Sequence, residues 1–286
     1  MRLWNTLRET LSLIRGKKST LLGLVIIIAF VVTSMVVLLS QILGMRVTPY
    51  DPIQQQVGPV LAGPSPQHIF GTDDLGRDVF SRVVAAIPNY LIVSVTVVAF
   101  AVFVGEFLGC YAAFRAGIVD EALMRVTDIF FAIPSLVLAM AIGIALGPGL
   151  TNMTLALMIV WWPAYARLAR GEALKVSHEN YVKAARISGL GNAGILVKHL
   201  IPNTIITMLV YATLDIGTVI VIYSGLSFLG LAVKPPAPDL GAMISEYQDY
   251  LVAAPWLPIL PGIVIALGVV AFSLFGDGLR DVIEAF

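Results

Sequence analysis

Long stretches without a charged side chain constrain this chain more than any other feature. No charged residue occurs from Ser19 to Met45, and none occurs from Ile129 to Ala166. A helix needs about 20 apolar residues to cross the hydrocarbon core of a bilayer, where every backbone polar group must be paired within the protein. Of the whole chain, 58% is hydrophobic and only 13% is charged. The sequence therefore predicts an all-α integral membrane protein.

The apolar stretches predict six transmembrane helices. The run from Ile129 to Ala166 is long enough for two of them, because Gly147-Pro148-Gly149 would break a helix and let the chain fold back. Each other run holds one span. The predicted spans are Leu21 to Leu43, Val83 to Phe114, the two halves of Ile129 to Ala166, Asn203 to Leu231 and Trp256 to Phe275.

The positions of lysine and arginine predict the direction of the chain across the membrane, because cytoplasmic segments are enriched in these residues. If both termini are cytoplasmic, residues 1–20 form a cytoplasmic N-terminal segment and residues 44–88 an extracytoplasmic segment rich in proline and glycine. Four of the eighteen basic residues then lie outside, namely Arg46, Arg77, Arg82 and Lys234. The opposite orientation would reverse this bias.

The cytoplasmic stretch from about 167 to 202 predicts a helix, a stop and a second short helix. Ser177 or Asn180 could cap the start of the first helix. Gly189 and Gly191 would end it, because glycine reaches positive φ without steric cost. An amphipathic linker lying on the membrane surface is the alternative interpretation.

The order of residues in this stretch resembles the EAA loop of ABC import permeases, with Lys183-Ala184-Ala185 at the EAA position and Gly189 at the glycine. In that family the loop is the coupling helix that docks into an ATPase subunit. Lys183 stands where glutamate is usual, and His199 stands where isoleucine is usual. The coupling residues implied by the resemblance are Glu179, Lys183, Ala184, Ala185, Gly189, His199 and Pro202.

Four further segments resemble the dipeptide, oligopeptide and nickel branch of this family, specifically its second permease subunit. One of them, HIFGTDDLGRDVFSRV at His68 to Val83, packs charges and two glycines into a tight turn beside a span. From the residues alone this turn is a self-satisfied set of exposed salt bridges, which contribute little to stability. The resemblance adds a contact with a binding protein, through Asp73, Asp74, Arg77 and Asp78. The other three segments are Asp120 to Ala139, Ser224 to Met243 and Pro261 to Asp281, in the order of the family.

The resemblance implies a type I ABC importer permease fold in a prokaryotic plasma or inner membrane, with residues 89–286 as the permease core. The implied partners are a second homologous permease, two ABC ATPase subunits and an extracytoplasmic solute-binding protein, with no nucleic acid. The implied cargo is a peptide, and relatives also handle oligosaccharides, nickel chelates and glutathione. The chain has no G-x-x-x-x-G-K-[ST] loop, so ATP and Mg would be held by the ATPase subunits and this chain would not be an enzyme.

Two ionisable residues inside predicted spans are candidates for the transport pathway, because such groups are costly in a membrane. Glu106 lies between Gly105 and Gly109, a spacing that lets a neighbouring helix approach closely. Asp215 is isolated in the fifth span and is predicted to face the pathway, with a hydrogen bond to a neighbouring helix as the alternative. The same two carboxylates could serve a secondary transporter, although the chain has no visible inverted repeat.

The remaining ionisable residues predict structure rather than chemistry. Asp128 lies one turn past Arg125 and is predicted to form a structural pair. His68, His178 and His199 are far apart in the sequence, so no metal site is predicted. A membrane-embedded enzyme would need paired catalytic groups or metal ligands, which the sequence does not provide.

Overall fold

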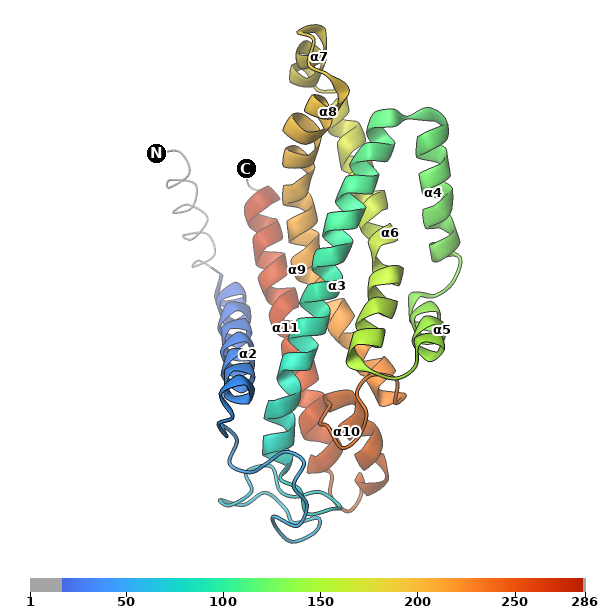
Figure 1. The fold of residues 1–286 in the computed structure, drawn as a ribbon. Coiled ribbons are helices and arrows are strands. Elements are labelled where there is room, and N and C mark those ends of the chain that lie inside the picture. Colours follow the sequence, from blue (N-terminus) through green and yellow to red (C-terminus); the bar gives the residue numbers. More distant parts are fainter. Residues whose placement is uncertain (1–16, 285–286) are drawn as a thin grey trace.

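The computed structural model describes residues 17–284, and within them long helices run along one common axis (Figure 1). Residues 1–16, most of the predicted N-terminal segment, lie outside the described residues. The helices are α2 (Lys18–Leu43), α3 (Val79–Arg115), α4 (Gly117–Phe131), α5 (Ser135–Leu146), α6 (Leu150–Ser177), α7 (Asn180–Ile187), α8 (Asn192–Ile195), η1 (Leu196–Leu200), α9 (Ile201–Phe228), α10 (Leu240–Tyr247), η2 (Gln248–Tyr250) and α11 (Trp256–Glu284).

Among residues 17–284, four helices are long and apolar enough to cross a membrane, and a bent pair gives a fifth candidate. The four are α2, α3, α11 and the continuous helix from Asn192 to Phe228. The predicted fourth span falls on α6, which is not among these candidates. Its apolar half contains Asn152, Trp162 and Pro163, which lower its hydropathy. A helix enclosed by other helices can carry such residues, because it does not have to dissolve in lipid.

The bent pair differs from the span that was predicted to begin at Ile129. Its first helix, α4, begins at Gly117, and the chain then turns by 85° between Phe131 and Ser135 into α5. Pro134 explains the break, because proline has no N–H and clashes with a preceding helical turn. The predicted fold-back at Gly147 to Gly149 is confirmed, since α5 ends at Leu146 and α6 begins at Leu150.

Helix α3 lies at the centre of the bundle and has its most extensive contact with α6. Two glycines make the close approach possible. A Cβ at Gly105 would lie 2.4 Å from the Tyr165 Cβ, and one at Gly109 would lie 2.2 Å from the Ala166 carbonyl oxygen. The prediction that these glycines allow a neighbouring helix to approach is confirmed.

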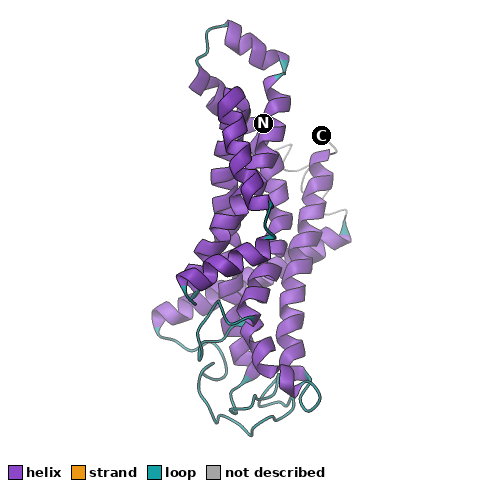
Figure 2. Cartoon of the chain, turned by 90° about the vertical axis from the view of Figure 1, so that its right-hand side faces the viewer, coloured by secondary structure: helices purple, strands orange, loops and turns teal. Residues whose placement is uncertain are grey.

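The two ends of the bundle are different. Loop-rich residues 44–78 and α10 gather at one end, while α7 and α8 project from the other (Figures 1 and 2). Helix α2 starts and α11 ends toward the α7 end, where Lys17 pairs with Asp281. Two further pairs tie α6 to α4 at this end: Arg170 contacts both oxygens of Asp120 at 2.5 and 2.6 Å. Arg167 contacts Asp128 at 2.5 Å, so the predicted partner Arg125 is wrong.

Candidate functional site

The predicted coupling loop contains the expected helix, stop and second helix. Helix α7 ends in a Schellman motif, in which Leu190 N–H donates to the Ala185 carbonyl and Gly189 N–H donates to that of Arg186, both at 3.1 Å. Gly189 has a φ of +85°, as predicted. The prediction for Gly191 is wrong, because its φ is −65° and it precedes α8 in an extended conformation. The second helix does not stop but continues through η1 into α9.

The predicted N-caps of this loop are also wrong. Glu179 occupies the cap position of α7, with no side-chain cap, and Asn180 is the first helical residue. The Ser177 hydroxyl instead donates to the Leu174 carbonyl at the end of α6. The chain therefore enters α7 through backbone geometry alone.

Helix α7 has one buried anchor and a wide exposed face. Val182 is 1% exposed and packs in a small cluster with Cys110, Ile195 and Leu200, whereas Ile187 is 88% exposed. The exposed side also carries Tyr181, Lys183 and Ala184. Tyr181 and Ile187 therefore give the projecting helix an exposed apolar surface that a partner can cover.

The other predicted coupling residues lie near the base of α7. The His199 ring lies 5.9 Å from the Tyr181 ring, which places the π-helical turn η1 beside α7. Pro202 is the second residue of α9 and follows the π-helical turn η1 closely. Ala185 is half-buried at the C-terminal end of α7.

Asp215 forms the hydrogen bonds to a neighbouring helix that were the predicted alternative to a pathway role. Its Oδ2 accepts hydrogen bonds from the Trp161 indole N–H at 2.6 Å and from the Tyr165 hydroxyl at 3.0 Å, so it binds a neighbouring helix. It also lines a pocket of about 380 Å³ formed by the bend between α4 and α5, by α6 and by α9. Aromatic side chains, among them Phe131 and Tyr211, make up much of the wall.

This pocket continues toward the α7 end of the bundle. A second pocket, of about 460 Å³, shares Phe131, Ala164 and Tyr211 with the first. Arg167 and Lys175 line its far part. We name the two together the α6/α9 groove, and it runs along α6 from Asp215 to the end that carries α7.

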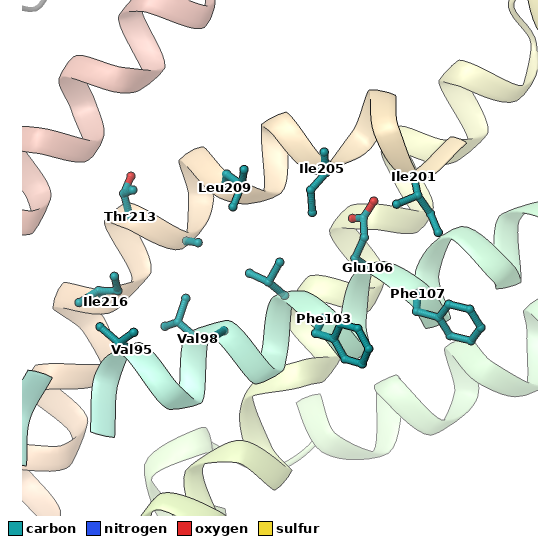
Figure 3. A pocket seen from close by; sticks show the side chains of 13 residues that line it. Val95, Val98, Phe103, Glu106, Phe107, Ile201, Ile205, Leu209, Thr213 and Ile216 are labelled. Atoms are coloured by element: carbon teal, nitrogen blue, oxygen red, sulfur yellow. The ribbon is translucent and has the colours of Figure 1, made fainter. Parts of the chain in front are cut away.

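Glu106 lies in a different place from Asp215. Figure 3 shows it on α3, directed toward α9, in a pocket of about 530 Å³ with almost wholly apolar walls. Thr204 on α9 donates a hydrogen bond to its Oε1, and the Cys110 thiol lies 3.5 Å from the same oxygen. Its Oε2 is buried without a hydrogen-bond partner in the described part of the chain. The structure therefore does not bring the two predicted pathway carboxylates together.

The charged turn within residues 68–83 is buried, so its interpretation as a set of exposed pairs is wrong. Asp73 is 0% exposed and accepts from Arg77 Nε at 2.5 Å and from the Tyr247 hydroxyl at 2.9 Å. Burial alone would lower the pKa of Arg77, but Asp73, Tyr247 and Glu246 together outweigh it and the pKa is raised. Burial raises the pKa of Tyr247, so its hydroxyl stays protonated and donates to Asp73.

The other residues of this turn also point inward. Asp78 caps α3 by accepting from Ser81 N–H at 2.8 Å, and His68 Nδ1 lies 2.9 Å from its second oxygen. Asp74 is the exception, since its side chain is 34% exposed. Of the four residues predicted to contact a binding protein, only Asp74 therefore offers its side chain to a partner.

Sequence reasoning missed a further buried carboxylate, that of Asp239, which joins three helices. Its Oδ1 accepts from the Tyr90 hydroxyl of α3 at 2.9 Å and from Ser227, and its Oδ2 accepts from the Tyr223 hydroxyl of α9 at 2.9 Å. The same side chain caps α10 at Gly241 N–H. An aspartate directly before the helix was the available signal, because aspartate is a preferred N-cap.

Comparison with known proteins identifies a family to which this chain is similar. Residues 105–286, from the middle of α3 to the C-terminus, match the family described as "Binding-protein-dependent transport system inner membrane component". The match includes Glu106, the α6/α9 groove and the predicted coupling loop.

Several curated relatives are similar over most of the chain. A protein named "Probable D,D-dipeptide transport system permease protein DdpC" from Escherichia coli is 40% identical over 88% of this chain and 86% of the relative. A "Dipeptide transport system permease protein DppC" from Alkalihalophilus pseudofirmus is 36% identical over 97% of this chain and 89% of the relative. A "Glutathione transport system permease protein GsiD" from Escherichia coli is 41% identical over 78% of this chain and 73% of the relative.

Proposed function

The chain belongs to the family of binding-protein-dependent transport inner membrane components, and we propose that, as a permease subunit of an ABC importer, it forms half of a pathway for small peptides. It is a multi-pass protein of the bacterial inner membrane. The names of the relatives support the cargo, since they specify D,D-dipeptide, dipeptide and glutathione transport, and each of these cargoes is a short peptide.

The observation that carries this function is the arrangement of α7. A short helix projects from one end of the bundle, is anchored through Val182, and leaves Tyr181 and Ile187 exposed. A subunit that must receive motion from an ATPase needs such a surface, held firmly enough to transmit a displacement. The proposed ATPase-coupling residues are therefore those of the predicted loop, with Gly189 fixing the end of the helix.

We further propose six membrane crossings with both termini in the cytoplasm. Helix α6 supplies the crossing that hydropathy leaves out, because it packs along α3 and is shielded from lipid by its neighbours. The end with α7 is then cytoplasmic, and the end with residues 44–78 and α10 is extracytoplasmic (Figure 1). The basic residues Arg167, Arg170 and Lys175 lie at the cytoplasmic end, as the positive-inside rule requires.

The proposed assembly contains a second homologous permease, two ATPase subunits and an extracytoplasmic binding protein. ATP and Mg are bound by the ATPase subunits, and this chain performs no bond chemistry. When the ATPases close on ATP, α7 moves and the helices around the α6/α9 groove change from an inward-open to an outward-open arrangement. The binding protein then releases its peptide into the groove, and ATP hydrolysis returns the pathway to its inward-open state.

Site-specific crosslinking tests the docking of α7. Cys110, the chain's single cysteine, is buried, so an introduced cysteine is the reactive thiol. We expect Ala184→Cys to crosslink to an ATPase subunit in the assembled complex. Ile118→Cys is the control, because Ile118 is 87% exposed at the same end of the bundle but lies outside the loop. Crosslinking that is equal at both positions, or absent at Ala184, would contradict the proposal.

A further inference from the structure

The pocket around Asp215 has an unusual balance of charge. Among the described residues that line it, Asp215 is the one acidic side chain and no basic side chain is present. Asp215 is only 7% exposed, and its hydrogen-bond donors, Trp161, Tyr165 and Thr218, are all neutral. A carboxylate in a membrane is costly unless a positive charge compensates it. The charge and the burial of Asp215 therefore favour a positively charged ligand in this pocket.

The walls of the pocket favour a cation as well. Phe130, Phe131, Trp161 and Tyr211 line it, and the faces of aromatic rings attract positively charged groups. The adjoining part of the α6/α9 groove provides an example, since the Arg167 guanidinium lies 4.2 Å above the Phe131 ring. Arg167 itself does not compensate Asp215, because it pairs with Asp128.

The pocket lies beside a bend in the chain and adjoins a second pocket. It lies where the chain bends by 85° between α4 and α5, so a movement of either helix changes its walls. It adjoins the second pocket through Phe131, Ala164 and Tyr211, which opens toward the cytoplasmic end. A group bound at Asp215 thus has a continuous route along α6.

We propose that Asp215 and the aromatic walls around it form a subsite that receives the positively charged amino group of the peptide cargo. The inference rests on the proposed function and names the part of the cargo that the pathway recognises. The ammonium group contacts the Asp215 carboxylate and the ring faces, while Trp161 and Tyr165 hold the carboxylate in place. Recognition is transient, because the same ammonium group must leave toward the cytoplasm.

A binding experiment on the assembled transporter in lipid nanodiscs, without the binding protein, tests this subsite. The probes are L-alanyl-L-alanine and its N-acetyl form, which differ in the charge of the amino group. Fluorescence of Trp161, whose indole lies 2.6 Å from Asp215, reports binding, and the Trp161→Phe variant identifies its signal. We expect the free dipeptide to bind roughly tenfold more tightly than the N-acetyl form, as loss of one ionic contact implies.

The Asp215→Asn variant separates recognition from structure. Its amide oxygen can still accept from Trp161 and Tyr165, but its charge is gone. We expect this variant to bind the two probes equally, and Asp215→Glu to keep part of the preference. Equal binding of both probes to the unmodified transporter would overturn the inference, as would a preference for the free dipeptide that survives in Asp215→Asn.

A parallel uptake measurement shows whether a negative result contradicts the subsite alone or the proposed function as well. Proteoliposomes with the unmodified complex and the binding protein are supplied with ATP and L-alanyl-L-alanine. If they import the dipeptide but the nanodiscs show no preference for the free amine, the subsite is wrong and the importer stands. If they import no peptide, the proposed cargo and the subsite both fail.

Discussion

Gly189 has a backbone conformation that any side chain would strain, although the space around it is empty. Its φ is +85°, and nothing lies within 4 Å of the position that a Cβ would take. The effect of a substitution is therefore purely conformational. Gly191, two residues later, also has open space but an ordinary φ of −65°.

We expect Gly189→Ala to destabilise the end of α7 by ~1 kcal/mol, because the left-handed conformation costs about that much for a residue with a Cβ. Displacement of α7 should lower ATP-dependent uptake while membrane insertion stays normal. Gly191→Ala is the matched control and should transport at the wild-type rate. If both variants behave alike, the role of the glycine is not conformational.

Single residues differ in how well the sequence reveals them. Asp215 could be predicted because a carboxylate in an apolar span stands out against its neighbours. Asp239 could not, since acidic residues are common in loops and its donor Tyr90 lies 149 residues away in the chain. The burial of Asp73 was also hidden, because the partner that encloses it, Tyr247, belongs to a distant helix.

At the scale of elements, buried ionic contacts join residues 44–78 to α10. Arg77 is 3% exposed, and Asp73, 2.5 Å away, is the nearest of its acidic partners. Glu246, which precedes Tyr247 in α10, lies 3.3 Å from Arg82 and 3.5 Å from Arg77. These contacts hold residues 44–78 against α3 and α10.

Removing the charge of Asp73 should therefore loosen this segment. We expect Asp73→Asn to destabilise the protein by about 3–5 kcal/mol, the usual cost of leaving a buried charge without its partner. Thermal unfolding of the purified complex and proteolysis within residues 44–78 measure the effect. Glu121→Gln is the control, because its pair with Arg125 is exposed and should change stability by less than about 1 kcal/mol. An equal effect of the two changes would contradict the buried network.

Elements follow from the sequence to different degrees. The end of α5 and the start of α6 were predictable, because glycine and proline mark the turn between the two helices. The 85° bend after α4 was not, since Pro134 marks a break but gives no direction. Helix α6 fits a span only in the context of α3, where Gly105 and Gly109 bring the two helices together.

For the whole molecule, the apolar runs and the basic residues determine the proposed topology. Gln67 and Lys234 are exposed at the end that this topology places outside the cell, and Ala193 is exposed at the end that it places in the cytoplasm. Cysteines at Gln67 and Lys234 should react with an impermeant maleimide in intact cells, whereas a cysteine at Ala193 should react only after the membrane is opened. Labelling of Ala193→Cys in sealed cells would invert the topology.

The overall arrangement could be predicted further than its interior. The order of the long helices and the position of the predicted coupling loop could be predicted from the sequence, because both depend on local composition. The α6/α9 groove depends on which helix faces pack together, and it joins Phe131, Trp161 and Asp215 from three separate helices. Hydropathy gives the length of a span but does not specify its neighbours.

Uptake of a dipeptide by proteoliposomes tests the central claim most directly. The vesicles contain this chain with its partner permease and ATPase subunits, the binding protein is added outside, and ATP is enclosed. The account predicts accumulation of L-alanyl-L-alanine that requires both ATP and the binding protein. Uptake that persists at the same rate without ATP would contradict it and would favour a secondary transporter.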